Sequence, residues 1–141
     1  MLLLAAAWPF LRIEGVEFAS ELHQIAKRNV AVFASRRPSG PHIVVRHEDA
    51  AEYTIPENPC IFYLYNPFGE PVLARILDNI EASFERNPRP IYFIYVNPKQ
   101  RHLLDQKSFV RPIIRPWRAR VLDRLTSPEP VAFYQAPGVL H

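Results

Sequence analysis

The stretch "IFYLYNPFGEP", residues 61–71, decides how this sequence is read. Its first five residues are apolar, which predicts a buried β-strand, and Glu70-Pro71 reads as the start of a helix because proline suits a first helical turn. Between the two, the chain passes through Asn66-Pro67. This pair could simply end the strand, since proline cannot donate to a ladder, or its polar side chain could hold a substrate. The residues alone leave both readings open.

The chain on either side of this stretch alternates helix and strand signals. A second apolar run, "IYFIYV" at 91–96, also ends at an Asn-Pro pair, and the apolar residues between the two runs recur at helical spacing. The other predicted elements are strands at 12–18 and 42–46, helices at 1–8, 20–35 and 98–106, and a late strand pair at 108–114 and 130–135. This alternation indicates an α/β fold, with a mostly parallel sheet covered by helices on both faces and an antiparallel pair at its end. We expect the strands at 61–65 and 91–95 to be adjacent at the centre of the sheet.

Length and composition fit one globular domain spanning 1–141. The chain has 141 residues, of which 48% are hydrophobic and 22% charged. Its net charge is +3, and the arginines gathered between 111 and 124 are interpreted as a solvated face because prolines interrupt them. The apolar start lacks a preceding basic residue and is too short to span a bilayer, so we interpret it as a buried helix of a cytoplasmic protein. We therefore expect no membrane partner.

Cysteine and histidine offer no metal site. Cys60 is the single cysteine, which excludes an internal disulfide and any cysteine cluster, and its apolar surroundings predict a buried thiol. His23, His42 and His47 lack the spacing of metal ligands and are predicted to be surface or capping residues. We expect no metal.

Polar side chains follow the predicted strands at the points where the strands end. Glu17 lies at the end of the first strand, Asp49 follows the second and Asn66 follows the third. Ligands of open α/β sheets bind outside the carboxyl ends of the strands, and an acid at such an end can accept the hydroxyls of a ribose. Glu17 could instead be a solvated loop acid and Asp49 a helix cap, but the combination favours a ligand site.

Three stretches, taken in order and with their spacing, resemble class I S-adenosylmethionine-dependent methyltransferases. They are "GVEFASELHQIAKRN", "HEDAAEY" and "FYLYNPFGEPVL", and the resemblance covers roughly residues 1–100. It implies a Rossmann-like fold and S-adenosyl-L-methionine as methyl donor. It also implies that Glu17 binds the adenosyl ribose, that Phe18 packs on adenine, and that Asp49 with Ala50 contacts the adenine amino group.

The third strand end is the implied site of methyl transfer. By the same resemblance Asn66, Pro67 and Phe68 border the acceptor, and Asn66 also touches the cofactor. Methyltransferases of planar amino nitrogens resemble one another in an Asn/Asp-Pro-Pro-aromatic motif, whereas this chain has Asn-Pro-Phe-Gly and lacks one proline. The acceptor class is therefore left open.

A second departure concerns the beginning of the family pattern. The family's first strand and glycine-rich turn would precede residue 1, and the chain has no glycine before Gly15. We accordingly interpret the chain as a partial methyltransferase domain that lacks the first strand. We expect it to bind S-adenosylmethionine weakly or not at all, and to self-associate through exposed strand edges or be poorly soluble.

Two other functions compete with the methyltransferase. A non-catalytic α/β remnant or binding module, completed by another chain, is the runner-up. A nucleic-acid-binding domain that uses the arginine cluster is the third reading, and strongly salt-dependent binding would favour it.

Overall fold

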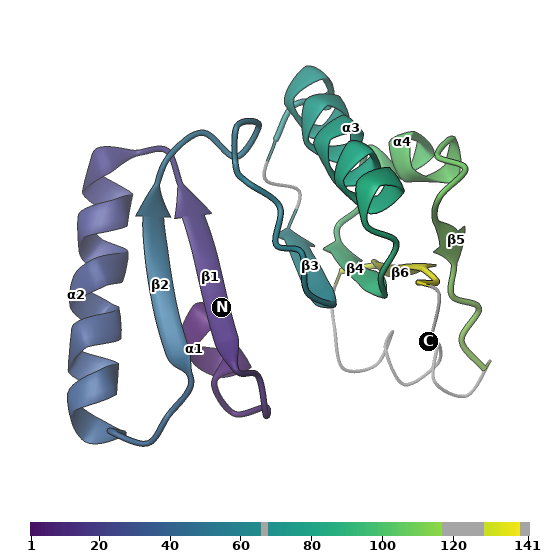
Figure 1. Cartoon of the computed structure of the whole chain (residues 1–141). Helices are drawn as coiled ribbons and strands as arrows, with labels where there is room; N and C mark the ends of the chain where they lie inside the picture. The colour runs from purple at the N-terminus through teal and green to yellow at the C-terminus, as the bar shows by residue number, and fades with distance from the viewer. Residues whose placement is uncertain (66–67, 117–128, 139–141) are drawn as a thin grey trace. The chain divides into compact units, whose positions relative to one another are not determined.

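The computed structural model describes residues 1–65, 68–116 and 129–138 (Figure 1). The chain forms two compact units, Met1–Tyr53 and Thr54–His141. Each unit has its own sheet, so the expectation of a single domain over 1–141 stays a prediction. None of the helices in the described part of the chain is long and apolar enough to cross a membrane.

The first unit is built on two parallel strands. Its elements are α1 (Leu2–Ala5), β1 (Arg12–Glu17), α2 (Ser20–Arg36) and β2 (His42–His47). β1 and β2 pair residue by residue, from Arg12 with His42 to Glu17 with His47. A Cβ atom on Gly15 would lie 2.7 Å from Leu2 Cδ1, so glycine lets α1 approach this face of β1 closely.

The helices of the first unit bury less than their sequences predict. α1 is shorter than the predicted helix at 1–8, and Met1, Leu4 and Trp8 are 64–68% exposed, which corrects the expectation of a buried helix. In α2, Leu22 and Ile25 of the predicted apolar face are exposed, and His23 is the buried residue. Two strands about 5 Å apart form a ribbon that is narrower than a helix with its side chains. Most of the helix surface therefore has no sheet surface to pack against within this unit.

The second unit carries a four-stranded sheet with the order β3-β4-β6-β5. Its elements are β3 (Cys60–Tyr65), α3 (Glu70–Arg86), β4 (Ile91–Val96), α4 (Arg101–Asp105), β5 (Arg111–Pro112) and β6 (Val131–Ala136). β3 and β4 are parallel and adjacent, and β5 and β6 form an antiparallel pair, as predicted. β6 is also antiparallel to β4, with Ile91 opposite Ala136.

One face of this sheet carries the core. α3 buries Leu73, Ile76, Leu77 and Ile80, and Figure 1 shows α3 and α4 on the same side of the sheet. Phe109 links the layers, with its ring centroid 5.6 Å from that of Phe84 and 6.5 Å from that of Phe93. The first pair is tilted and the second is edge-on, and such contacts between aromatic rings join helix and sheet in a continuous apolar layer.

The position and exposure of β3 contradict one expectation. β3 stands at the end of its strand order, and its side chains at Ile61, Tyr63 and Tyr65 are 38–53% exposed. The prediction that 61–65 lies at the sheet centre is therefore wrong. An unbroken apolar run does not distinguish a strand covered on both faces from one with exposed tyrosines, because the tyrosine hydroxyl tolerates water.

A buried arginine joins the segments around the core. Arg89 is 4% exposed, and its guanidinium donates hydrogen bonds to five acceptors. These are the backbone oxygens of Pro56, Asn58, Ser83 and Asn87 and the hydroxyl of Ser83. Two of these carbonyls belong to the C-terminal end of α3, where the helix dipole favours a cation. The buried charge is thus compensated by backbone dipoles.

Candidate functional site

The carboxyl ends of β1 and β2 meet at one edge of the first unit. Because the strands are parallel and Glu17 pairs with His47, the segments that follow them leave the sheet side by side. These segments carry the predicted cofactor residues Glu17, Phe18, Asp49 and Ala50. The edge is the position at which open α/β sheets bind ligands.

Glu17 and Phe18 form the turn from β1 into α2. Oε1 of Glu17 accepts a hydrogen bond of 2.8 Å from the Ala19 amide. The second carboxylate oxygen makes no hydrogen bond in the part of the chain that the structure describes. The Phe18 side chain is 76% exposed, so little of the ring is packed against the protein. A carboxylate oxygen and an aromatic ring are thus available at the same turn.

Asp49 and Ala50 form the turn after β2. Oδ1 of Asp49 accepts from the Ala51 amide at 2.9 Å, and the Asp49 carbonyl accepts from the Glu52 amide at 3.0 Å. Asp49 therefore caps its own turn, which is the alternative role considered for it from the sequence. Capping engages one carboxylate oxygen, and the other has no partner among the described residues. Both acids of the edge can thus accept one more donor.

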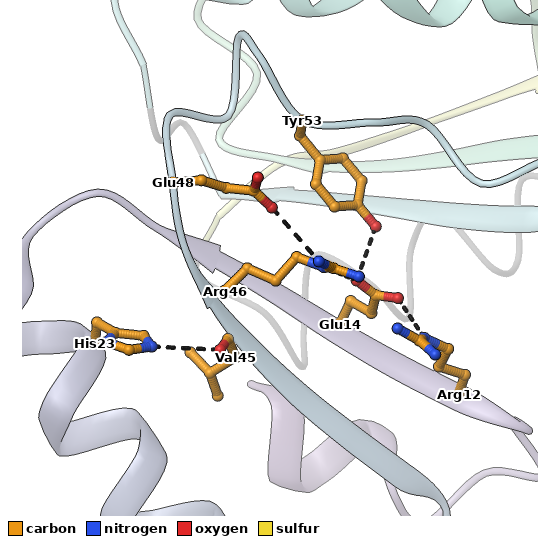
Figure 2. Close-up of polar contacts among 7 residues, drawn as sticks. All are labelled: Arg12, Glu14, His23, Val45, Arg46, Glu48 and Tyr53. Atoms are coloured by element: carbon orange, nitrogen blue, oxygen red, sulfur yellow. Dashed lines mark hydrogen bonds and ion pairs between the residues drawn. The ribbon is translucent and has the colours of Figure 1, made fainter.

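His23 and His47, which the sequence predicts to be surface or capping residues, lie at this edge. Nε2 of His47 lies 3.0 Å from the Phe18 carbonyl oxygen. Nε2 of His23 lies 3.3 Å from the Val45 carbonyl oxygen (Figure 2). The two rings are stacked, with centroids 5.0 Å apart and an interplanar angle of 16°. The prediction of a surface or capping role is wrong for His23, which is 8% exposed. Packing of α2 on β2 brings together two residues that are 24 positions apart in the sequence, so no local pattern predicts this contact.

A charged cluster occupies the opposite face of β1 and β2. Glu14 accepts hydrogen bonds from the guanidinium groups of Arg12 and Arg46 and from the Tyr53 hydroxyl (Figure 2). Burial acts to raise the pKa of Glu14, but the hydrogen bonds from Arg46, Arg12 and Tyr53 outweigh it and lower the pKa. Burial, followed by the Glu14 charge and hydrogen bond, raises the pKa of Tyr53 to about 12. The cluster joins both strands to the segment after β2.

The predicted catalytic stretch is only partly within the described residues. Asn66 and Pro67 lie outside them, so the two readings of this pair stay predictions. Phe68 is half-buried and comes just before α3. The end of β4 is described: Asn97 has a left-handed φ of 49° and donates its amide to the Pro130 carbonyl at 2.8 Å. Asparagine is among the residues that tolerate this conformation best.

Cysteine, histidine and acidic side chains are the groups that could hold a transition-metal ion. Over 1–65, 68–116 and 129–138, no group of three or more His, Cys, Asp or Glu residues is placed to hold a metal ion. Cys60 is half-buried at the start of β3, and burial raises the pKa of its thiol although the Arg89 charge opposes this. A thiol kept protonated is a poor nucleophile.

Comparison with known proteins identifies the fold. No family model matches the chain, and no curated protein matches it either. Among solved structures it is similar to HI0767 of Haemophilus influenzae, described as a candidate methylase, with a TM-score of 0.53 and 13% identity over 90% of this chain and 73% of that one. It is also similar to SMU.472, described as a candidate methyltransferase and solved with SAH, with a TM-score of 0.50 and 12% identity over 92% of this chain and 32% of that one.

At such low identity these likenesses establish the fold and leave the activity open. The chain has a methyltransferase-like α/β fold. It spans about a third of the length of SMU.472. The resemblance inferred from three short stretches of sequence is thereby confirmed at the level of the fold.

Proposed function

We propose that this chain is an S-adenosylmethionine-dependent methyltransferase domain whose adenosine site is the edge formed by β1 and β2. The proposal rests on the side chains grouped at one strand edge of a methyltransferase-like fold. They are an exposed aromatic ring and two acids, each with one carboxylate oxygen that accepts a hydrogen bond and one that does not. The free oxygen of Glu17 accepts the ribose hydroxyls. Phe18 stacks on adenine, and Asp49 with Ala50 meets the adenine amino group.

The residues present suit this ligand on chemical grounds. Ribose hydroxyls are donors, and an acid at a strand end is a common acceptor for them in dinucleotide-binding folds. An exposed aromatic ring stacks on any base, because every base has a π-face. The free oxygens of Glu17 and Asp49 and the exposed ring of Phe18 therefore each match one of the proposed contacts.

The reaction is transfer of a methyl group from sulfur to a nucleophile. The bond from the sulfonium sulfur to the methyl carbon breaks, and its electron pair stays on sulfur, which leaves S-adenosylhomocysteine. The acceptor forms the new bond with its lone pair and releases a proton to solvent. Holding donor and acceptor in line supplies much of the rate.

On the acceptor side the proposal assigns Asn66, Pro67 and Phe68 to the border of the reacting nucleophile. Asn66→Ala should lower the rate of S-adenosylhomocysteine formation more than it lowers thermal stability. Equal activity in the mutant and the parent would leave only the strand-ending role for this pair.

Titration with S-adenosylhomocysteine, followed by NMR of the ¹⁵N-labelled chain, tests the proposal and measures even weak binding. The largest amide shifts are expected at 17–19 and 49–51. Glu17→Ala should weaken binding about fivefold or more, the effect of one hydrogen bond. Glu21→Ala, an exposed acid in the first turn of α2, is the matched control and should bind as the parent does. Absent shifts at the edge, or equal losses in both variants, would refute the assignment.

A second candidate, a non-catalytic module completed by another chain, is favoured by the strand order. Among the described strands β1 pairs only with β2, and β3 stands at the end of its sheet, so each has an edge that could accept a further strand. Light scattering over a range of protein concentrations tests it. A mass that rises with concentration, without any response to S-adenosylhomocysteine, would support this candidate over the enzyme.

A further inference from the structure

The turn that carries Glu17 and Phe18 has little packing of its own. The Phe18 ring is largely exposed, and Ser20 and Glu21, which open α2, are exposed as well. Its own backbone makes two local bonds, from the Ala19 amide to Glu17 Oε1 at 2.8 Å and from the His23 amide to the Ala19 carbonyl at 2.9 Å. Something outside the turn must therefore fix the direction in which Phe18 and Glu17 point.

His47 supplies that contact from the neighbouring strand. Its Nε2 lies 3.0 Å from the Phe18 carbonyl oxygen. A carbonyl can only accept, so Nε2 carries the hydrogen and donates it. His47 is the last residue of β2 and the register partner of Glu17, so the bond ties the turn to the strand edge itself.

The His47 ring is in turn held by His23. The stacked rings are nearly parallel, and His23 is buried between α2 and β2, with its Nε2 donating to the Val45 carbonyl. Stacking on a buried ring limits the orientations that the exposed His47 ring can adopt. The sequence of contacts therefore runs from β2 through His23 and His47 to the Phe18 backbone.

We infer that His47 is a positioning residue of the adenosine site, which holds the Phe18 backbone so that the Phe18 ring and the free Glu17 oxygen face the same ligand. This inference rests on the proposed function for the identity of that ligand. It adds a residue that touches neither adenine nor ribose but fixes both groups that do.

Two variants of His47 test its hydrogen bond to Phe18 and its stacking on His23 separately. His47→Phe keeps a ring that can stack on His23 but has no donor. His47→Gln loses the ring but places an amide Nε2 the same number of bonds from Cβ, so it can still donate to Phe18. His42→Phe applies the same change at the opposite end of β2 and is the matched control. His47 is exposed, so all three variants should fold, which thermal unfolding checks.

Binding of S-adenosylhomocysteine and of 5′-methylthioadenosine is then measured by NMR titration. His47→Phe should weaken both ligands by the same factor of about five, because the lost bond orders the adenosine side that they share. His47→Gln should restore most of that loss, and His42→Phe should have no effect. Unchanged binding in His47→Phe, or equal losses in His47→Phe and His47→Gln, would overturn the inference.

Hydrogen exchange of the Ala19 amide with solvent tests whether His47 holds the turn, even if the parent binds neither ligand. Absence of all binding would refute the methyltransferase proposal by itself. The Ala19 amide should still exchange several times faster in His47→Phe than in the parent, and as slowly as in the parent in His47→Gln. Equal exchange in His47→Phe and the parent would show that His47 does not hold the turn.

Discussion

The two units of this chain differ: one contains most of the buried apolar side chains, and the other contains the candidate site. The unit Met1–Tyr53 buries two apolar side chains among the described residues, Ile13 and Ala51, whereas Thr54–His141 buries twelve. The first unit instead carries the charged cluster around Glu14, the stacked histidines and the candidate adenosine site. Stability should therefore come mainly from apolar packing in the second unit and from polar contacts in the first.

The largest effect is expected from Phe93→Ala in the second unit. Phe93 is 1% exposed and contacts the rings of Phe62 and Phe109, so its removal leaves a cavity beneath α3. The free energy of unfolding should fall by about 3–5 kcal/mol. Urea unfolding measures it, with Ile13→Ala in the first unit as the comparison. If Ile13→Ala costs as much as Phe93→Ala, the division of the core between the units is wrong.

Arg89→Met should cost about 2–3 kcal/mol in the second unit. The change removes a donor to five buried or half-buried acceptors, and unsatisfied carbonyls are costly. Lysine cannot reproduce the planar fork, so Arg89→Lys should recover only part of the loss. Urea unfolding is again the measurement. Arg86→Met, an exposed change in the last turn of α3, should be nearly neutral, and a similar loss there would argue against a special role for Arg89.

Glu14→Gln should lower the stability of the first unit by about 1 kcal/mol at pH 7, because it replaces a charge that accepts three hydrogen bonds. The pKa of Glu14 is lowered on folding, so its contribution is present above the ordinary value of 4.5 and is lost as pH falls through the lower, folded value. The mutant and the parent should therefore converge in urea unfolding at acidic pH. A difference that stays constant down to that range would mean that the Glu14 charge is not the cause.

The smallest effect is a shift in one tyrosine titration. Tyr53 in the first unit and Tyr134 in the second both have a pKa of about 12, raised first by burial and then by a carboxylate, Glu14 for Tyr53 and Asp105 for Tyr134. Glu14→Gln should lower the pKa of Tyr53 and leave that of Tyr134 unchanged. Asp105→Asn should lower the pKa of Tyr134 and leave that of Tyr53 unchanged. Ultraviolet titration resolves them, with Tyr53→Phe and Tyr134→Phe to assign the signals. A shift of both tyrosines in either variant would mean that the two clusters are not independent.

The strands and long helices of this protein are determined by local sequence. The apolar runs at 61–65 and 91–96 became β3 and β4, the helix predicted to begin near Pro71 became α3, and the late strand pair is antiparallel as expected. The edge that gathers Glu17 and Asp49 was also predictable, because parallel strands end together. Periodicity and strand-ending prolines act within a few residues, so they can be read without knowing the neighbours in space.

Only the tertiary structure decided which faces are covered and which polar groups meet. Sequence could not place β3 at the end of its sheet, expose Leu22 and Ile25, or bring His23 onto His47, because burial depends on what packs opposite. The residue type determines which interactions a side chain can make, but residues distant in the chain determine which of them it makes. Glu14 accepts hydrogen bonds from Arg46 and Tyr53 only because the fold brings them together. In the same way, the fold places the Phe18 carbonyl oxygen 3.0 Å from Nε2 of His47.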